Sequence, residues 1–213
     1  KCYIDELNIY IPQKEREKII AIGNPNTFTT EEDINLNTKK NVIIFVGRLN
    51  DWVKNTIDFI KVWELLYTNN PSWRVKLVGD DSNCQEIKKY INENKIKRIE
   101  FCGYQKEVEK IYKEAKIICM TSHYEGWPMV LSEAMSYGCI PCVYSSFGAV
   151  YEIIDNKFNG VLCPPYNINY MSTAIQQLIN DPDLINKYAI NAKKKISNFN
   201  IDNIINQWEH IIL

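Results

Sequence analysis

Two cations follow the first apolar run of the sequence and could bind one anion together. Arg48 comes directly after Gly47, at the end of the run 41–47, and Lys54 stands six residues after Arg48, where a helical pattern begins. In parallel α/β sheets, ligands bind outside the carboxyl ends of the strands, which is where both side chains would lie. A guanidinium offers a fork of N–H donors and an ammonium a compact charge. The spacing therefore predicts an anion site, and the alternative is two ordinary surface cations.

Two glutamates accompany a second predicted strand-to-helix junction. Glu125 lies in a glycine-containing turn after the apolar run 117–121, and Glu133 follows inside a predicted helix with seven residues between them. Pro128 suits the first helical position, where backbone N–H groups favour a phosphate. Because the other face of this helix is apolar and would pack on the sheet, Glu133 needs a buried partner or a ligand hydroxyl. Carboxylates suit hydroxyl-rich ligands, although a solvated helical glutamate is the simpler alternative.

The elements that must position these residues form a regular alternation from residue 41 onward. Short β-rich runs are predicted as strands and amphipathic stretches as helices, which favours βαβ units and a parallel sheet in an α/β fold. The expected strands are 41–47, 74–79, 99–102, 117–121, 140–144 and 160–163. The expected helices are 54–68, 84–94, 105–115, 128–137, 149–154, 168–180, 182–197 and 201–212.

The first forty residues do not follow this alternation. They suggest a helix over 2–9, a short strand over 18–22 and a polar connector over 27–40. The chain begins with Lys1, which looks like an interior start, so we expect a fragment of a longer protein. The predicted division is a remnant of a preceding domain with a connector (1–40), one main domain (41–200) and a C-terminal helix (201–213).

Composition excludes several functional classes. The 213 residues carry 25 Lys and Arg against 26 Asp and Glu, a net charge of −1, which argues against a nucleic-acid binder. No apolar run reaches the length of a membrane helix. Seven cysteines, scattered through apolar segments, predict reduced thiols in a cytoplasmic protein. The sequence contains neither G-x-G-x-x-G nor a P-loop motif, which argues against NAD-type and P-loop nucleotide sites.

Two further short motifs have simpler structural explanations. Cys139 and Cys142 spell C-x-x-C, but a helix is expected before them and a strand after them, the reverse of a redox dithiol. No second such pair exists to complete a zinc site. The segment Asp181-Pro182-Asp183 resembles a metal-binding D-x-D, yet it also fits a helix start with Asp181 as N-cap and Pro182 first in the helix. We therefore predict no metal site.

At this point the motifs resemble a known family. Glu125-x7-Glu133, running on through residues 134–141, resembles the E-x7-E signature of retaining glycosyltransferases of family 4. The G-R-L at residues 47–49 with Lys54 is similar to that family's phosphate-binding pair, and the stretches 147–154 and 159–165 also fit. The resemblance covers roughly residues 41–180. One departure is Trp127-Pro128, which replaces the commoner Phe-Gly.

The resemblance implies a role for each matching residue. The family has the GT-B architecture of two Rossmann-like domains, and this chain matches the C-terminal, donor-binding one. Arg48 and Lys54 would neutralise the donor diphosphate, and Gly47, directly before Arg48, is a further donor-binding residue. Glu133 would hold the ribose hydroxyls, and Glu125 would contact hydroxyls of the transferred sugar. Since a proline at position 128 removes one phosphate-facing N–H, that contact must come from Gly126, Met129 or Val130. Tyr104 and the Gly79-Asp80 turn are further candidates for the base pocket.

The implied reaction is transfer of a sugar from a nucleotide diphosphate donor to an acceptor hydroxyl with retention at the anomeric carbon. UDP is the expected nucleotide and GDP the second choice, with no metal or other cofactor and with a surface polysaccharide or glycolipid as product. The acceptor site would lie on the missing N-terminal domain, which would also make any membrane contact, so the isolated chain should be inactive. Two alternatives stay open: a non-transferase GT-B enzyme such as a UDP-sugar epimerase, and a flavodoxin-like binding module.

Overall fold

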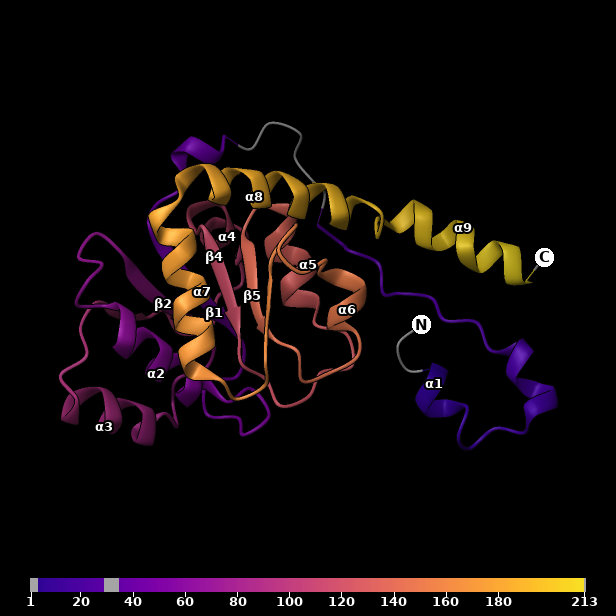
Figure 1. The fold of residues 1–213 in the computed structure, drawn as a ribbon, viewed down its shortest axis with the longest axis horizontal. Coiled ribbons are helices and arrows are strands. Elements are labelled where there is room, and N and C mark those ends of the chain that lie inside the picture. The colour runs from indigo at the N-terminus through magenta and orange to yellow at the C-terminus, as the bar shows by residue number, and fades with distance from the viewer. Residues whose placement is uncertain (1–3, 29–34, 213) are drawn as a thin grey trace.

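The computed structural model describes residues 4–28 and 35–212, and a six-stranded parallel sheet forms its centre (Figure 1). The strand order is β3-β2-β1-β4-β5-β6, the order of a Rossmann-type doubly wound sheet. This order differs from the flavodoxin-like 2-1-3-4-5 arrangement, so the flavodoxin-like topology of that alternative is wrong. The strands are β1 Val42–Val46, β2 Arg74–Val78, β3 Ile99–Phe101, β4 Ile117–Met120, β5 Ile140–Tyr144 and β6 Val161–Cys163.

Helices connect and cover the strands. They are α1 Ile4–Leu7, α2 Thr56–Leu66, α3 Gln85–Glu93, α4 Glu109–Glu114, α5 Met129–Ser136, α6 Val150–Ile153, α7 Ile168–Asn180, α8 Pro182–Ser197 and α9 Ile201–Ile212, with 3-10 turns at η1 Gln13–Lys18 and η2 Leu36–Thr38. From residue 41 the predicted alternation is confirmed, although α4 begins only at Glu109. The Asp181 carboxylate caps α8 by accepting from the Leu184 N–H at 2.9 Å, as the sequence predicts.

Each face of the sheet has its own apolar core. In β1, Ile43 and Phe45 pack into the core that contains the buried faces of α2 and α7, whereas Val42 and Ile44 pack into the core that contains α4 and α5. A strand that is buried on both faces reads as a continuous apolar run, which is why residues 42–46 show no alternation. Helices on both faces leave the carboxyl ends of the strands as the accessible edge for a ligand.

The cysteines within the described ranges are free. Cys139 and Cys142 are fully buried, and burial raises the pKa of both thiols. Gly138 separates the end of α5 from β5, in the order expected from the sequence. The C-x-x-C therefore belongs to the hydrophobic core, and Cys2 lies outside the described residues.

The N-terminal segment differs from the sequence prediction. No strand forms over 18–22; a 3-10 turn ends at Lys18 and irregular chain follows, because without a neighbouring strand the apolar Ile19, Ile20 and Ile22 have no ladder to join. Of the predicted helix over 2–9, the described part contains Ile4–Leu7, and the chain turns at Asn8 and Ile9; residues 1–3 lie outside the described part. This segment and α9 both extend away from the sheet on one side (Figure 1).

The predicted polar connector contains a buried cation. Residues 29–34 lie outside the described part, but Lys39 is only 7% exposed and lies against the end of α4. Its Nζ donates to the carbonyl oxygens of Tyr112 and Ala115 at 2.7 and 2.5 Å. Burial lowers the pKa of this ammonium. An ammonium at these carbonyls is also favoured by the negative end of the helix dipole.

Membrane-spanning helices are not found among residues 4–28 and 35–212, since none of the helices there is both long and apolar enough.

Two glycines meet where β1 and β2 end. Gly79 has a φ of +149°, and a Cβ added to it would lie 1.8 Å from the carbonyl oxygen of Gly47. The Gly47 N–H donates to Val78 O, and the Gly79 N–H to Gly103 O, both at 2.9 Å. Because this contact is between backbone atoms, a side chain at position 79 can be accommodated only by displacing the chain that leads into Arg48.

This contact predicts a large difference between two glycine substitutions. Gly79→Ala should lower the free energy of unfolding by at least about 3 kcal/mol, since it combines a backbone clash with a strained φ. Gly103→Ala is the matched control: Gly103 has a φ of +64°, but an added Cβ meets nothing within 4 Å, so the cost should be about 1–2 kcal/mol. Urea denaturation followed by circular dichroism measures both. Equal midpoints for Gly79→Ala and the unmodified chain would contradict the proposed clash.

Candidate functional site

The candidate site lies where the strand order reverses, between the loops that follow β1 and β4. Chain connections leave the sheet in opposite directions from these neighbouring strands, and in doubly wound sheets this switch point is where ligand crevices form. We call the region between the two loops the crevice. The two loops are joined by hydrogen bonds: the His123 N–H donates to Val53 O at 2.8 Å, and Thr121 Oγ1 donates to Asn55 O at 2.8 Å. The segments that carry the predicted cations and the first predicted glutamate are thus held side by side.

Lys54 and Glu125 form an ion pair in this crevice. Lys54 Nζ lies 2.6 Å from Glu125 Oε1, with the two side chains only 18% and 12% exposed. Ser122 Oγ donates to the same oxygen at 2.7 Å. The lysine stem lies over Gly47, where an added Cβ would be 3.5 Å from Lys54 Cδ. Because both side chains are largely buried, this ion pair is screened much less than a surface pair, so its attraction is stronger.

Arg48 occupies a different environment from Lys54. Its guanidinium pairs with Asp51 Oδ2 at 2.6 Å, and its side chain is 75% exposed. Asp51 also accepts the Val53 N–H at 2.8 Å, which shapes the loop between β1 and α2. The sequence predicts one anion shared by Arg48 and Lys54, whereas in the structure each cation contacts a carboxylate of the protein. Because the Arg48 side chain is exposed, a bound anion can draw it inward at the loss of an ion pair that is solvent-exposed on the arginine side.

The start of α5 differs by one residue from the sequence prediction. Pro128 is the N-cap, with φ −79° and ψ +83°, and Met129 is the first helical residue. The Met129 N–H donates to Trp127 O at 2.9 Å, so this donor is already used within the turn. Gly126 is exposed, and an added Cβ there would meet nothing within 4 Å. Val130, the second helical residue, is half-buried beside it.

The carboxylate of Glu133 has a buried hydrogen-bond partner, as the sequence analysis expects for its position. The Tyr112 hydroxyl, from α4, donates to Glu133 Oε2 at 2.8 Å. Burial raises the pKa of the Glu133 carboxyl; the Tyr112 bond lowers it in part, and the nearby charge of Glu109 raises it. The pKa of Tyr112 is itself raised, first by burial and then by the Glu133 charge. Oε1 of Glu133 accepts no hydrogen bond from the residues the structure describes, so it is the oxygen that a ligand hydroxyl could reach.

The predicted base-pocket candidates lie on neighbouring loops. Tyr104 follows Gly103 after β3 and is 75% exposed. Asp80, next to Gly79, accepts the Ser82 N–H at 3.0 Å, and this bond lowers the pKa of its carboxyl. The structure brings neither side chain into contact with the Lys54–Glu125 pair.

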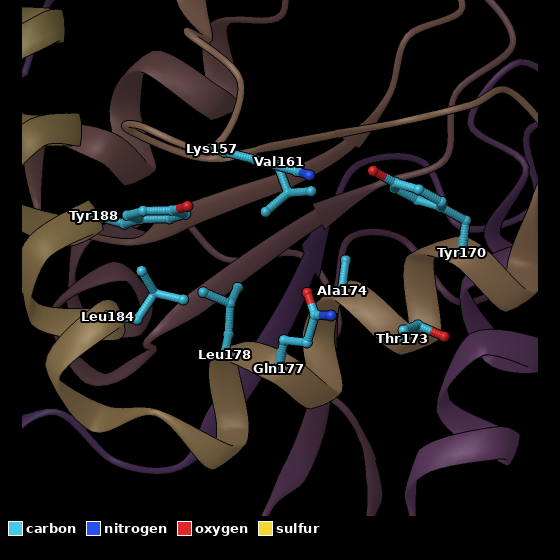
Figure 2. A pocket seen from close by; sticks show the side chains of 9 residues that line it. All are labelled: Lys157, Val161, Tyr170, Thr173, Ala174, Gln177, Leu178, Leu184 and Tyr188. Atoms are coloured by element: carbon cyan, nitrogen blue, oxygen red, sulfur yellow. The ribbon is translucent and has the colours of Figure 1, made fainter.

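Two hollows are lined by residues that lie close in sequence to the predicted site residues. One, of about 300 Å³, is lined by Asp51, Trp52 and His123 among others; the Trp52 and His123 rings stack 4.9 Å apart. The other, of about 580 Å³, lies between the N-terminal segment, α9 and the turn that contains Gly126 and Trp127. A third hollow, of about 250 Å³, lies beside α7 and α8, and Figure 2 labels the residues that line it. None of the predicted site residues is among them.

Sequence reasoning missed several of the residues that hold the site in place. Asp51, Ser122 and Tyr112 each bond a predicted residue, but single Asp, Ser and Tyr residues carry no distinctive spacing. Asn55 adopts a left-handed conformation, with φ +48°, directly before α2. Asparagine tolerates this conformation better than most residues. An asparagine directly before a helical pattern could therefore have indicated the turn that places Lys54 at the start of α2. Clusters of three or more metal-ligating side chains are not found within the described part of the chain.

Comparisons with known proteins agree with this geometry. The chain is 27% identical over 208 residues to an uncharacterized glycosyltransferase of Haemophilus influenzae, which covers 97% of the chain and 58% of that protein. It is 30% identical over 174 residues to the UDP-Gal:alpha-D-GlcNAc-diphosphoundecaprenol alpha-1,3-galactosyltransferase of Escherichia coli, covering 78% of the chain and 44% of that protein. The chain thus spans about half the length of these curated relatives.

A solved structure shows the same fold. A point mutant of S. aureus TarM, crystallised with Fondaparinux, alpha-GlcNAc-glycerol and UDP, superposes with a TM-score of 0.80 at 22% identity over 98% of this chain and 41% of that one. The family model described as Glycosyl transferases group 1 matches residues 26–195, which include every residue of the crevice. The chain therefore belongs to the group 1 glycosyl transferases and has the fold of their GT-B C-terminal domains.

Proposed function

We propose that this chain binds a nucleotide-diphosphate sugar, with UDP as the nucleotide, for a retaining transfer of family 4 type to an acceptor hydroxyl. The observation that carries the proposal is the fixed Lys54–Glu125 pair, with Glu133 further along on α5. Two relatives support the nucleotide: the E. coli enzyme is named for UDP-Gal, and the S. aureus structure holds UDP. The E. coli relative is named for a diphosphoundecaprenol acceptor, which supports a glycolipid product, and a 28% identical relative of Erwinia amylovora is named for amylovoran biosynthesis, which supports a surface polysaccharide.

The chemistry of the proposed reaction needs positive charge beside the leaving group. Negative charge grows on the diphosphate as the glycosidic bond breaks, and a cation fixed there stabilises the transition state more than the ground state. Lys54 is held in place by Glu125, and Arg48 stands on the solvent side of the same loop. Glu125 orients the Lys54 ammonium and can accept hydrogen bonds from hydroxyls of the transferred sugar. We propose that these groups act without a metal ion.

The rest of the enzyme lies outside this chain in our proposal. The acceptor would bind to a preceding domain, so the isolated chain would bind donor but give negligible transfer. The free cysteines of the described residues, most of them buried, support a cytoplasmic location, with any membrane contact made by that preceding domain. A UDP-sugar epimerase would share the crevice but would act on the donor without an acceptor, which product analysis distinguishes.

Nucleotide binding should depend on Glu133. Glu133→Ala should weaken UDP binding roughly 10–150-fold, because charge-assisted bonds to hydroxyls contribute about 1.5–3 kcal/mol. Calorimetric titration with UDP, GDP and a UDP-sugar, each with Mg²⁺ and with EDTA, measures the affinity, the base preference and the metal requirement. Glu93→Ala, an exposed glutamate of α3, is the control. Equal affinity in Glu133→Ala and the unmodified chain would remove Glu133 from the site.

The diphosphate contribution should be visible in a pair of variants. Lys54→Met should weaken UDP binding more than uridine binding, because the Glu125 charge then faces the phosphates without the ammonium that balances it. Adding Glu125→Gln to Lys54→Met should recover part of that loss by removing the repulsion. Arg48→Ala should lower the affinity for UDP roughly 10–150-fold, because a charge-assisted bond to the diphosphate is lost. If the double variant bound UDP no better than Lys54→Met alone, the pair would not lie beside the diphosphate.

The affinity should also fall in mild acid. Burial raises the folded-state pKa of Glu133, so this carboxyl becomes protonated at a higher pH than an ordinary glutamate. The ionised form accepts the ribose hydroxyls, so its contribution is present above that pKa and lost as pH falls through it. UDP titrations from pH 8 to pH 4.5 test this against Glu133→Gln, which retains the titration of UDP itself. Superimposable profiles for the two proteins would show that Glu133 is not the titrating group.

A further inference from the structure

Tyr112 is a buried phenol that the proposed mechanism does not use. It lies on α4, is fully buried, and donates its hydroxyl to Glu133 Oε2 at 2.8 Å. Glu133 is on the following helix, α5, and α4 and α5 contact each other. The Tyr112 hydroxyl, the only polar group of this side chain, therefore binds the Glu133 carboxylate that we propose contacts the ribose.

The ring is fixed by aromatic neighbours on two sides. Tyr137 stacks on it with centroids 6.0 Å apart and planes at 24°, and Phe28 meets it edge-on at 6.3 Å and 81°. Both neighbours belong to or pack against the same apolar core as Tyr112. The phenol cannot swing away from Glu133 without opening this core, so the hydroxyl has one position.

The backbone of Tyr112 is fixed as well. Its carbonyl accepts from Lys39 Nζ at 2.7 Å and from the Cys139 thiol at 3.2 Å. The Lys39 ammonium also holds Ala115 O, about one turn further along. The buried Lys39 ammonium therefore holds the C-terminal end of α4 in place at Tyr112, the residue whose side chain contacts Glu133.

We propose that Tyr112 is a positioning residue that orients Glu133 for the vicinal ribose hydroxyls of the donor and thereby sets the preference for ribonucleotides; this rests on the proposed function. With Oε2 engaged by the phenol, Oε1 is the oxygen presented to a ligand. An ionised carboxylate that accepts one fixed donor loses less freedom when it accepts a second. Without the phenol the carboxylate can rotate, and its contacts to ribose weaken while contacts to the diphosphate are unaffected.

The chain offers a matched control for this bond. Tyr90, on α3, donates its hydroxyl to Glu64 Oε2 at 2.7 Å, the same chemistry away from the crevice. This bond, together with burial and the Glu64 charge, raises the pKa of Tyr90 to about 12. Tyr90→Phe thus removes a Tyr–Glu bond without touching Glu133. Tyr112→Phe keeps the packed ring, and half-buried Glu133 can take water in place of the hydroxyl, so this variant should fold.

The experiment compares UDP with 2′,3′-dideoxy-UDP by calorimetric titration of the 213-residue chain. The unmodified chain should prefer UDP, and Tyr112→Phe should reduce that preference roughly 2–12-fold, the range for one intramolecular hydrogen bond. Tyr90→Phe should leave the preference unchanged. A purely structural role for Tyr112 would lower the unfolding midpoint and both affinities together but leave their ratio constant, which would overturn the proposal.

A double-variant cycle tests whether Tyr112 acts through Glu133. In a Glu133→Ala background, adding Tyr112→Phe should not alter the ratio of the two affinities any further; a further change would overturn the proposal. The outcome also separates this inference from the proposed function. Binding of UDP with ribose preference intact in Tyr112→Phe rejects the inference alone, whereas an unmodified chain that does not bind UDP rejects the donor site and the inference with it.

Discussion

Parallel pairing of β1 with β4 is the constraint on which the site depends. These strands are neighbours in the sheet but far apart in sequence, and the chain leaves them toward opposite sides. Their carboxyl ends are consequently the one place where two loops can face each other without a connection passing between them. Lys54 comes from one loop and Glu125 from the other, and the arrangement of the two loops allows their side chains to form the 2.6 Å ion pair.

The contact also determines the electrostatics of the crevice. A lysine alone at this depth would be costly to bury, and a glutamate alone equally so, but together they are neutral and fixed. A phosphate ligand would compete with Glu125 for the ammonium, whereas a sugar hydroxyl would add to the carboxylate without competing. A ligand that brings both groups therefore fits the pair better than one that brings phosphate alone, which agrees with a nucleotide sugar as the proposed donor.

The sequence predicted the sheet better than it predicted the site. Strands buried on both faces, such as 42–46, and capped helices, such as the one that begins after Asp181, carry their signals locally. The Glu125–Glu133 spacing located α5, because both residues belong to one junction. The ion pair of Lys54 with Glu125 and the bond of Tyr112 to Glu133 join residues far apart in sequence, and no local pattern specifies them. The strand expected over 18–22 failed for the converse reason: apolar residues were present, but no partner strand was.

Lys39 has a consequence for how the protein can be divided. By pattern it belongs to the polar segment before β1, yet its ammonium lies inside the domain and bonds two backbone carbonyls of the α4 terminus. A shortened chain that began at residue 41 would contain every strand of the sheet but would lose this donor. The Tyr112 and Ala115 carbonyls would then depend on the weak Cys139 thiol donor, and α4 would be free to fray at its C-terminal end. The smallest piece that keeps the crevice intact therefore includes residues that form no strand of the sheet.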